Sequence, residues 1–168
     1  MTPEQAFDLH HQAVFRFVYR LTQRADLAED ITQDCFLAYL RAGERFDAQR
    51  GTSLKTYLIA IARNLAFKWV RDYGRECQID DPFESSTPSE SGAAFDISTA
   101  VATAVASLAP LQQEALILFE YEGFTLEEIA AISGVDIGTV KSRLHRARER
   151  LRRILAPLKR VGDPNART

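Results

Sequence analysis

Seven basic side chains crowd residues 134–153, GVDIGTVKSRLHRARERLRR, where only two acidic side chains accompany them. The basic residues are Lys141, Arg143, Arg146, Arg148, Arg150, Arg152 and Arg153. Guanidinium groups donate paired hydrogen bonds to phosphate oxygens and to the edge of guanine. Because the whole chain has a net charge of −2, this concentration indicates a local surface for a polyanion.

A second basic stretch, residues 50–75, carries six basic residues and one acidic residue, whereas residues 76–135 hold eleven acidic residues and no basic one. Aromatic side chains interleave with this positive charge: Tyr57, Phe67, Trp69 and Tyr73. Unstacked bases stack on such platforms, so the pattern suits single-stranded nucleic acid. For Trp69, a place in a helical core fits the spacing equally well.

Catalytic and metal chemistry are not expected. His10 and His11 are adjacent, so on a helix their side chains point about 100° apart and cannot share a metal ion. Cys35 and Cys77 give neither a disulfide framework nor the spacing of a metal site. No apolar run approaches the roughly 18 residues that span a bilayer, and the N-terminus does not resemble a secretory signal. We therefore expect a reduced, cytoplasmic protein without a cofactor, a resident metal or membrane contact of its own.

The elements that position these side chains are predicted to be helices. In the first part of the chain, Thr2 with Gln5 and Asp26 with Glu29 have the spacing of capping boxes. Apolar residues then recur at helical spacing from residue 54 to about residue 74.

In the second part, helices are predicted at residues 100–108 and 111–121. Thr125 opens a short third helix with another capping box. A turn containing Gly134 follows, and Asp136 caps a last helix that reaches about Leu155. A short helix, a turn with glycine and a second helix form the pattern of a helix-turn-helix.

We accordingly expect an all-α fold with two small helical domains, residues 1–75 and 99–160, the second of them a helix-turn-helix. Residues 76–98 are acidic and rich in Ser and Pro, which predicts a flexible linker. Residues 161–168 are predicted to be a short tail.

Placing residues at about 100° per step sorts the last helix into faces. One stripe is apolar and must face the core: Val140, Leu144, Ala147, Leu151 and Ile154. The opposite face carries Ser142, His145, Arg146 and Glu149, and the basic residues lie on two flanks, one of them Lys141, Arg148 and Arg152. This layout suits a helix in a major groove, with base edges in front and phosphates on both walls. A solvated basic surface helix is the alternative, and Glu149 either accepts from a cytosine or pairs with a neighbouring Arg.

Three segments resemble a known family. Residues 28–40 (AEDITQDCFLAYL), 51–72 (GTSLKTYLIAIARNLAFKWVRD) and 123–151 (GFTLEEIAAISGVDIGTVKSRLHRARERL) are similar to regions 2.2, 2.3–2.4 and 4.2 of bacterial extracytoplasmic-function (ECF) sigma factors. The resemblance implies a protein that binds core RNA polymerase at its clamp and flap, recognises promoter DNA and helps to melt it. It also implies an anti-sigma factor as a controlling partner.

The resemblance assigns residues to three contacts. Those for core polymerase are Asp30, Gln33, Asp34 and Phe36. Those for the −10 element are Thr52, Ser53, Leu54 and Lys55 in a base-capturing loop, with Asn64, Lys68 and Arg71 along the single strand. Those for the −35 element are Lys141, Ser142, Arg143, His145, Arg146, Glu149 and Arg150. Asp34 stands where the family more often has Glu, and Cys35 where Thr or Val is commoner.

The acidic linker either mimics RNA in the polymerase's exit path or is merely a soluble tether. Two other functions compete with the sigma interpretation. An ordinary helix-turn-helix regulator would not need the basic and aromatic first domain. A sigma-like mimic that sequesters an anti-sigma factor would be expected to lose the basic outward face, which is rich here.

Overall fold

The computed structural model describes residues 1–43, 51–77 and 97–161, and every regular element in these ranges is a helix. The prediction of an all-α fold is therefore confirmed for the described part of the chain. The chain divides into two compact units, Met1–Gly92 and Ala93–Thr168. The predicted linker lies outside the described residues over positions 78–96, and so does the predicted tail from residue 162.

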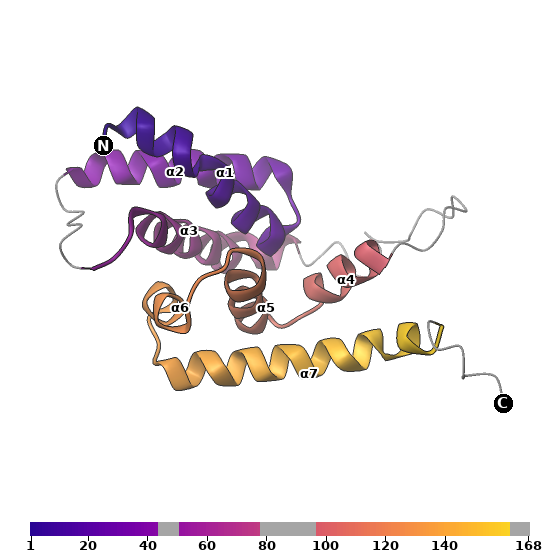
Figure 1. Cartoon of the computed structure of the whole chain (residues 1–168). Coiled ribbons are helices and arrows are strands. Elements are labelled where there is room, and N and C mark those ends of the chain that lie inside the picture. Colours follow the sequence, from indigo (N-terminus) through magenta and orange to yellow (C-terminus); the bar gives the residue numbers. More distant parts are fainter. Residues whose placement is uncertain (44–50, 78–96, 162–168) are drawn as a thin grey trace. The chain divides into compact units, whose positions relative to one another are not determined.

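The first unit consists of α1 (Pro3–Thr22), α2 (Ala25–Ala42) and α3 (Leu54–Cys77) (Figure 1). Each of these three helices packs against the other two. The shared core is built from fully buried aliphatic and aromatic side chains: Val14, Phe17, Val18, Leu58 and Ile59. Helix α3 continues to Cys77, beyond the end that was predicted near residue 74.

The helix starts of this unit show one correct prediction and one wrong one. Thr2 and Gln5 form the predicted capping box, with bonds of 3.2 and 2.9 Å between their side chains and each other's backbone N–H. Asp26, in contrast, is not the N-cap, because α2 begins at Ala25 with Arg24 at that position. The Arg24 guanidinium binds the Asp26 carboxylate at 2.7 Å and lowers its pKa, so an ion pair has replaced the predicted cap.

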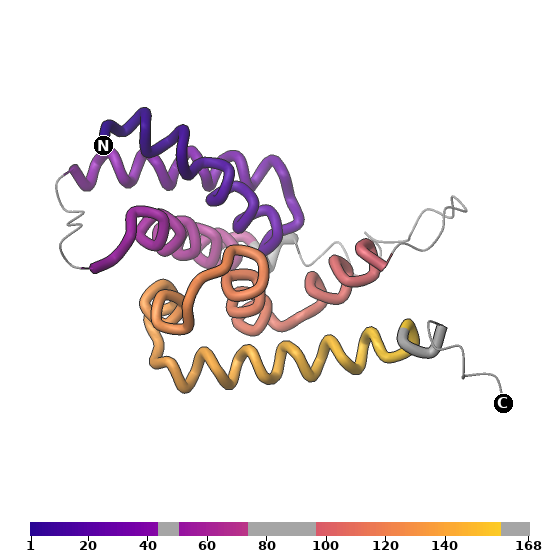
Figure 2. The backbone as a smooth tube through the Cα atoms, in the orientation of Figure 1, coloured from indigo at the N-terminus to yellow at the C-terminus, as the bar shows by residue number. Residues whose placement is uncertain are grey.

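The second unit consists of α4 (Ile97–Ala106), α5 (Pro110–Leu116), η3 (Ile117–Tyr121), α6 (Leu126–Ser133) and α7 (Ile137–Val161). Helices α4, α5 and α6 all pack on the 25-residue helix α7, most of which is the long orange-to-yellow tube in Figure 2. The structure starts α4 three residues before the predicted position and extends α7 past Pro157 to Val161.

The segment predicted as one helix over residues 111–121 changes its winding partway. It is α-helical up to Leu116 and π-helical from Ile117 to Tyr121. The Glu122 N–H donates to the Ile117 carbonyl at 3.1 Å, five residues back, which is the bonding pattern of a π-helix. The wider turn changes the direction in which Phe119 and Glu120 leave the helix.

The apolar stripe predicted on the last helix faces the core. Val140, Leu144 and Ala147 are buried, and Leu151 and Ile154 are half-buried where α7 runs toward its end. The opposite side of the helix is thereby left to solvent. Among the described helices, none combines the length and the apolar character needed to cross a bilayer.

Cys35 is buried between α2 and α3, where its thiol donates to the Leu58 carbonyl at 3.2 Å. Burial raises the pKa of this thiol to about 12. Only the thiolate is a nucleophile, so Cys35 is expected to be chemically inert in the folded chain.

In a Cys77→Ser variant, where Cys35 is the remaining thiol, we expect almost no reaction with a disulfide reagent at pH 8. One full equivalent should react after denaturation. Stopped-flow absorbance measures both. Reaction of the folded variant at the rate of free cysteine would contradict the buried environment.

Candidate nucleic-acid interface

Local interactions set the start of α7. Thr125 and Glu128 form the predicted capping box of α6. Gly134 ends that helix with φ of 67°, a left-handed conformation that favours glycine. The Asp136 carboxylate then accepts the Thr139 N–H at 2.7 Å, which confirms the predicted cap and lowers the pKa of Asp136. These caps fix α6, the turn and α7 as a helix-turn-helix.

The outward face of α7 carries the predicted reading residues. Ser142, His145 and Arg146 are exposed, and Glu149 is half-buried. Lys141 and the arginines of the flanks are exposed or half-buried alongside them. The exposed hydroxyl, imidazole and guanidinium provide donors of the kind that bind base edges in a major groove.

Glu149 pairs within its own helix. Its carboxylate lies 3.6 Å from the His145 Nε2 and 4.0 Å from the Arg153 guanidinium, each one turn away. The sequence left two roles open for Glu149, a contact with a cytosine or a pair with a neighbouring Arg. In the free chain it lies near Arg153 of its own helix. Glu149 therefore lies beside His145 on the outward face of α7.

Arg148, on the flank where helical geometry placed it, contacts residues of its own unit. Its guanidinium donates to Glu120 at 3.0 Å and lies 5.3 Å from the centre of the Phe119 ring. Both partners belong to the π-helical turn η3. Arg148 thus ties α7 to the neighbouring element, and its charge is already matched within the unit.

In the first unit, the predicted −10 loop leads into α3. Ser53 is exposed, and its hydroxyl accepts the Thr56 N–H at 3.1 Å at the first turn of the helix. Thr52, Leu54 and Lys55 are half-buried. Partial burial lowers the pKa of His10, and the nearby ammonium charge of Lys55 lowers it further.

Farther along α3, Asn64, Lys68 and Arg71 are exposed and follow one another at helical spacing, so they share a face. The aromatic residues nearby are covered by cations of the same unit. Arg63 lies 4.6 Å from the Phe67 ring centre, and Arg24 lies 5.3 Å from that of Trp69. Trp69 is half-buried. Its exposure is thus intermediate between that of a core residue and that of an exposed stacking platform, the two interpretations that the sequence allowed.

The residues predicted to bind polymerase separate into two groups. Asp30, Gln33 and Asp34 are exposed on α2. Phe36 is only 6% exposed and meets the Phe7 ring edge-on at 5.0 Å. Phe36 therefore packs beneath the exposed face of α2 and supports it.

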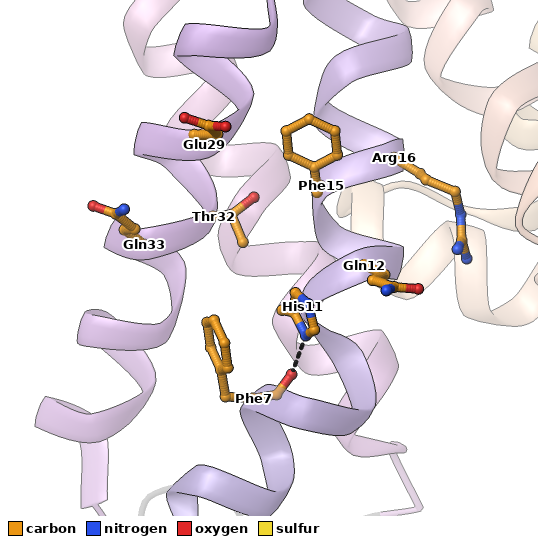
Figure 3. Close-up of a pocket in the computed structure, with 8 residues that line it drawn as sticks. All are labelled: Phe7, His11, Gln12, Phe15, Arg16, Glu29, Thr32 and Gln33. Atoms are coloured by element: carbon orange, nitrogen blue, oxygen red, sulfur yellow. Dashed lines mark hydrogen bonds between the residues drawn. The ribbon is translucent and has the colours of Figure 1, made fainter.

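A groove of about 490 Å³ adjoins the exposed α2 face (Figure 3). Its lining residues come from α1 and α2: Phe7, His11, Gln12, Phe15, Arg16, Glu29, Thr32 and Gln33. Phe7 and His11 stack at 4.6 Å, and the His11 Nδ1 lies 2.8 Å from the Phe7 carbonyl oxygen. The sequence motifs did not single out Phe7 or Phe15 as part of a surface. Phe7, His11, Phe15 and Tyr19 place a ring at every fourth residue of α1. This spacing is the sequence pattern that could have indicated the surface.

The second unit is thus a helix-turn-helix with an exposed basic last helix, and the first carries the basic helix α3 and a groove lined by α1 and α2. Residues 6–76 match the Sigma-70 region 2 family, and residues 98–151 match Sigma-70, region 4. The chain belongs to the ECF sigma factors, a family of transcription initiation factors.

Individual relatives agree with this assignment. The RNA polymerase sigma factor CarQ of Myxococcus xanthus is 33% identical over 92% of this chain and 90% of its own length. The ECF sigma factor SigE of Mycolicibacterium smegmatis is 36% identical over 88% of this chain, which spans 59% of that longer protein. The sigma factor RpoE of Bartonella quintana, solved with the anti-sigma factor NepR, has a TM-score of 0.72 and 34% identity over 91% of this chain and 96% of its own.

The different surroundings of two arginines on α7 lead to a test. Arg148→Ala removes an ion pair and a cation–π contact, so we expect it to lower the free energy of unfolding by about 1 kcal/mol. Arg152→Ala, at an exposed position, should change it by less than about 0.5 kcal/mol. Chemical denaturation followed by circular dichroism measures both, and equal stabilities would contradict the role given to Arg148.

Proposed function

We propose that the chain acts as the promoter-recognition subunit of a bacterial RNA polymerase. The observation that carries this proposal is the capped helix-turn-helix, whose last helix exposes Ser142, His145 and Arg146 to solvent. In this proposal, residues 99–160 bind the −35 element and residues 1–75 bind both core polymerase and the −10 element. Residues 76–98 tether the two domains.

The −35 contacts belong to the exposed side of α7, with base edges read from its centre and phosphates bound on its flanks. The predicted members are Lys141, Ser142, Arg143, His145, Arg146, Glu149 and Arg150. Arg148 is not assigned a phosphate contact in this proposal, because its guanidinium already donates to Glu120.

The −10 contacts and the polymerase contacts are assigned to different parts of the first unit. The loop before α3 and the first residues of that helix supply Thr52, Ser53, Leu54 and Lys55 to a captured base, while Asn64, Lys68 and Arg71 line the strand. Helix α2 presents Asp30, Gln33 and Asp34 to the polymerase clamp, supported by the buried Phe36. The groove beside Gln33 enlarges this docking surface.

Regulation by an anti-sigma factor is supported by the solved relative in complex with NepR. The protein would act in the cytoplasm and would have no catalysis of its own, since the polymerase forms the RNA. A mimic that only sequesters an anti-sigma factor has no need for exposed donors on α7, so the geometry favours the DNA-binding function.

The proposal is tested by adding the chain to core polymerase and assaying native-gel comigration and run-off transcription. We expect comigration and promoter-specific transcripts. Asp34→Lys, which reverses a charge on the exposed face of α2, should weaken comigration and leave the fold intact. A chain that neither comigrates with core nor supports any specific transcript would not be a sigma factor.

Arg146→Ala should weaken −35 recognition by about 1–3 kcal/mol at particular base positions, because a bidentate contact to a base is lost. Arg152→Ala should weaken binding evenly across sequences and reduce its salt dependence. Transcription from a set of −35 variants at several salt concentrations separates the two effects. If the two variants behave alike, the division of α7 into a reading face and a phosphate flank is wrong.

A further inference from the structure

Glu114 places a carboxylate in the interior of the second unit. The residue is 0% exposed, and the three that follow it on the chain, Ala115 to Ile117, are buried and apolar. Burying a carboxylate away from water is unfavourable unless hydrogen bonds compensate for the lost solvation. Here the Ser133 hydroxyl donates to the Glu114 Oε1 at 3.2 Å, and both groups are buried.

Ser133 lies at the junction between α6 and the turn of the helix-turn-helix. It is the last residue of α6, and Gly134 directly after it makes the left-handed turn. Residues 134–136 alone separate it from the first residue of α7, Ile137. Glu114, on α5, therefore holds the chain immediately before the turn that aims the reading helix.

We infer that Glu114 is a positioning residue for base recognition, and this inference rests on the proposed function. Its hydrogen bond to Ser133 sets the direction in which α7 leaves the turn. An apolar side chain of similar volume would fill the same space, but it would lack a directional bond. Bidentate contacts to base edges require a closely defined geometry, whereas phosphate contacts tolerate more variation. Loss of the bond is thus expected to reduce discrimination between bases more than overall DNA affinity.

Three variants of the full-length chain separate positioning from simple stability. Glu114→Gln keeps an acceptor oxygen for Ser133, Glu114→Met removes it at similar volume, and Ser133→Ala removes the donor. The measurement is the ratio of transcripts from a promoter used by the wild type and from the same promoter with one −35 base changed. It is made with core polymerase at temperatures where each variant is folded.

We expect the ratio to fall about tenfold in Glu114→Met and in Ser133→Ala, the loss that one misplaced base contact would cause. In Glu114→Gln it should stay near the wild-type value. If Glu114→Met and Ser133→Ala keep the wild-type ratio and differ only in melting temperature, Glu114 is merely structural and the inference is overturned. Should Glu114→Met fail to fold, Ser133→Ala decides in the same way.

Amide hydrogen exchange in the free chain provides a readout that does not depend on transcription. The N–H groups of Gly134 and Val135 both donate to the Ala130 carbonyl in the turn. Their exchange should be faster in Glu114→Met than in Glu114→Gln, and equal rates would overturn the inference. A wild-type chain without promoter-specific transcription would refute the proposed function, while the exchange rates would still test the positioning role.

Discussion

The burial of a narrow apolar stripe on α7 is the constraint on which the second unit depends. Val140, Leu144 and Ala147 lie against the other helices, and their burial fixes the rotation of α7 about its own axis. Once that rotation is set, Ser142, His145 and Arg146 can only face outward. Hydrophobic packing on one side of the helix therefore determines which polar groups are offered on the other.

Positive charge in this protein serves two purposes that the sequence does not distinguish. Some guanidinium groups hold the fold together: Arg24 lies over Trp69, Arg63 over Phe67 and Arg148 over Phe119. Others, such as Arg146 and Arg152, remain exposed. An arginine that contacts a ring or a carboxylate of its own unit has part of its charge engaged there. Counting basic residues thus overestimates the charge available to nucleic acid.

The first unit shows the same division for apolar groups. Phe36 was predicted at a partner-binding position and is buried, whereas Phe7, which was assigned to no contact, is 41% exposed. The two rings meet edge-on, so the exposed ring rests on the buried one. The surface beside α2 is consequently a groove lined by rings and polar groups, with an acidic helix face next to it. Aromatic side chains can belong to a core and a surface at the same time, since one edge packs while the other meets solvent.

The sequence by itself determined the features that arise from neighbours along the chain. The caps at Thr2, Thr125 and Asp136, the helical character and the faces of α7 all follow from interactions within a few residues. The tertiary structure decided the features in which distant groups compete with local ones. Arg24 engages Asp26 and Trp69 where a cap was expected, and the π-helical turn brings Glu120 to Arg148. The hydrogen bond between the buried Glu114 and Ser133, 19 residues away, is likewise decided by the tertiary structure. A helical period specifies which face a residue occupies, but only the packed fold specifies which partner lies opposite that face.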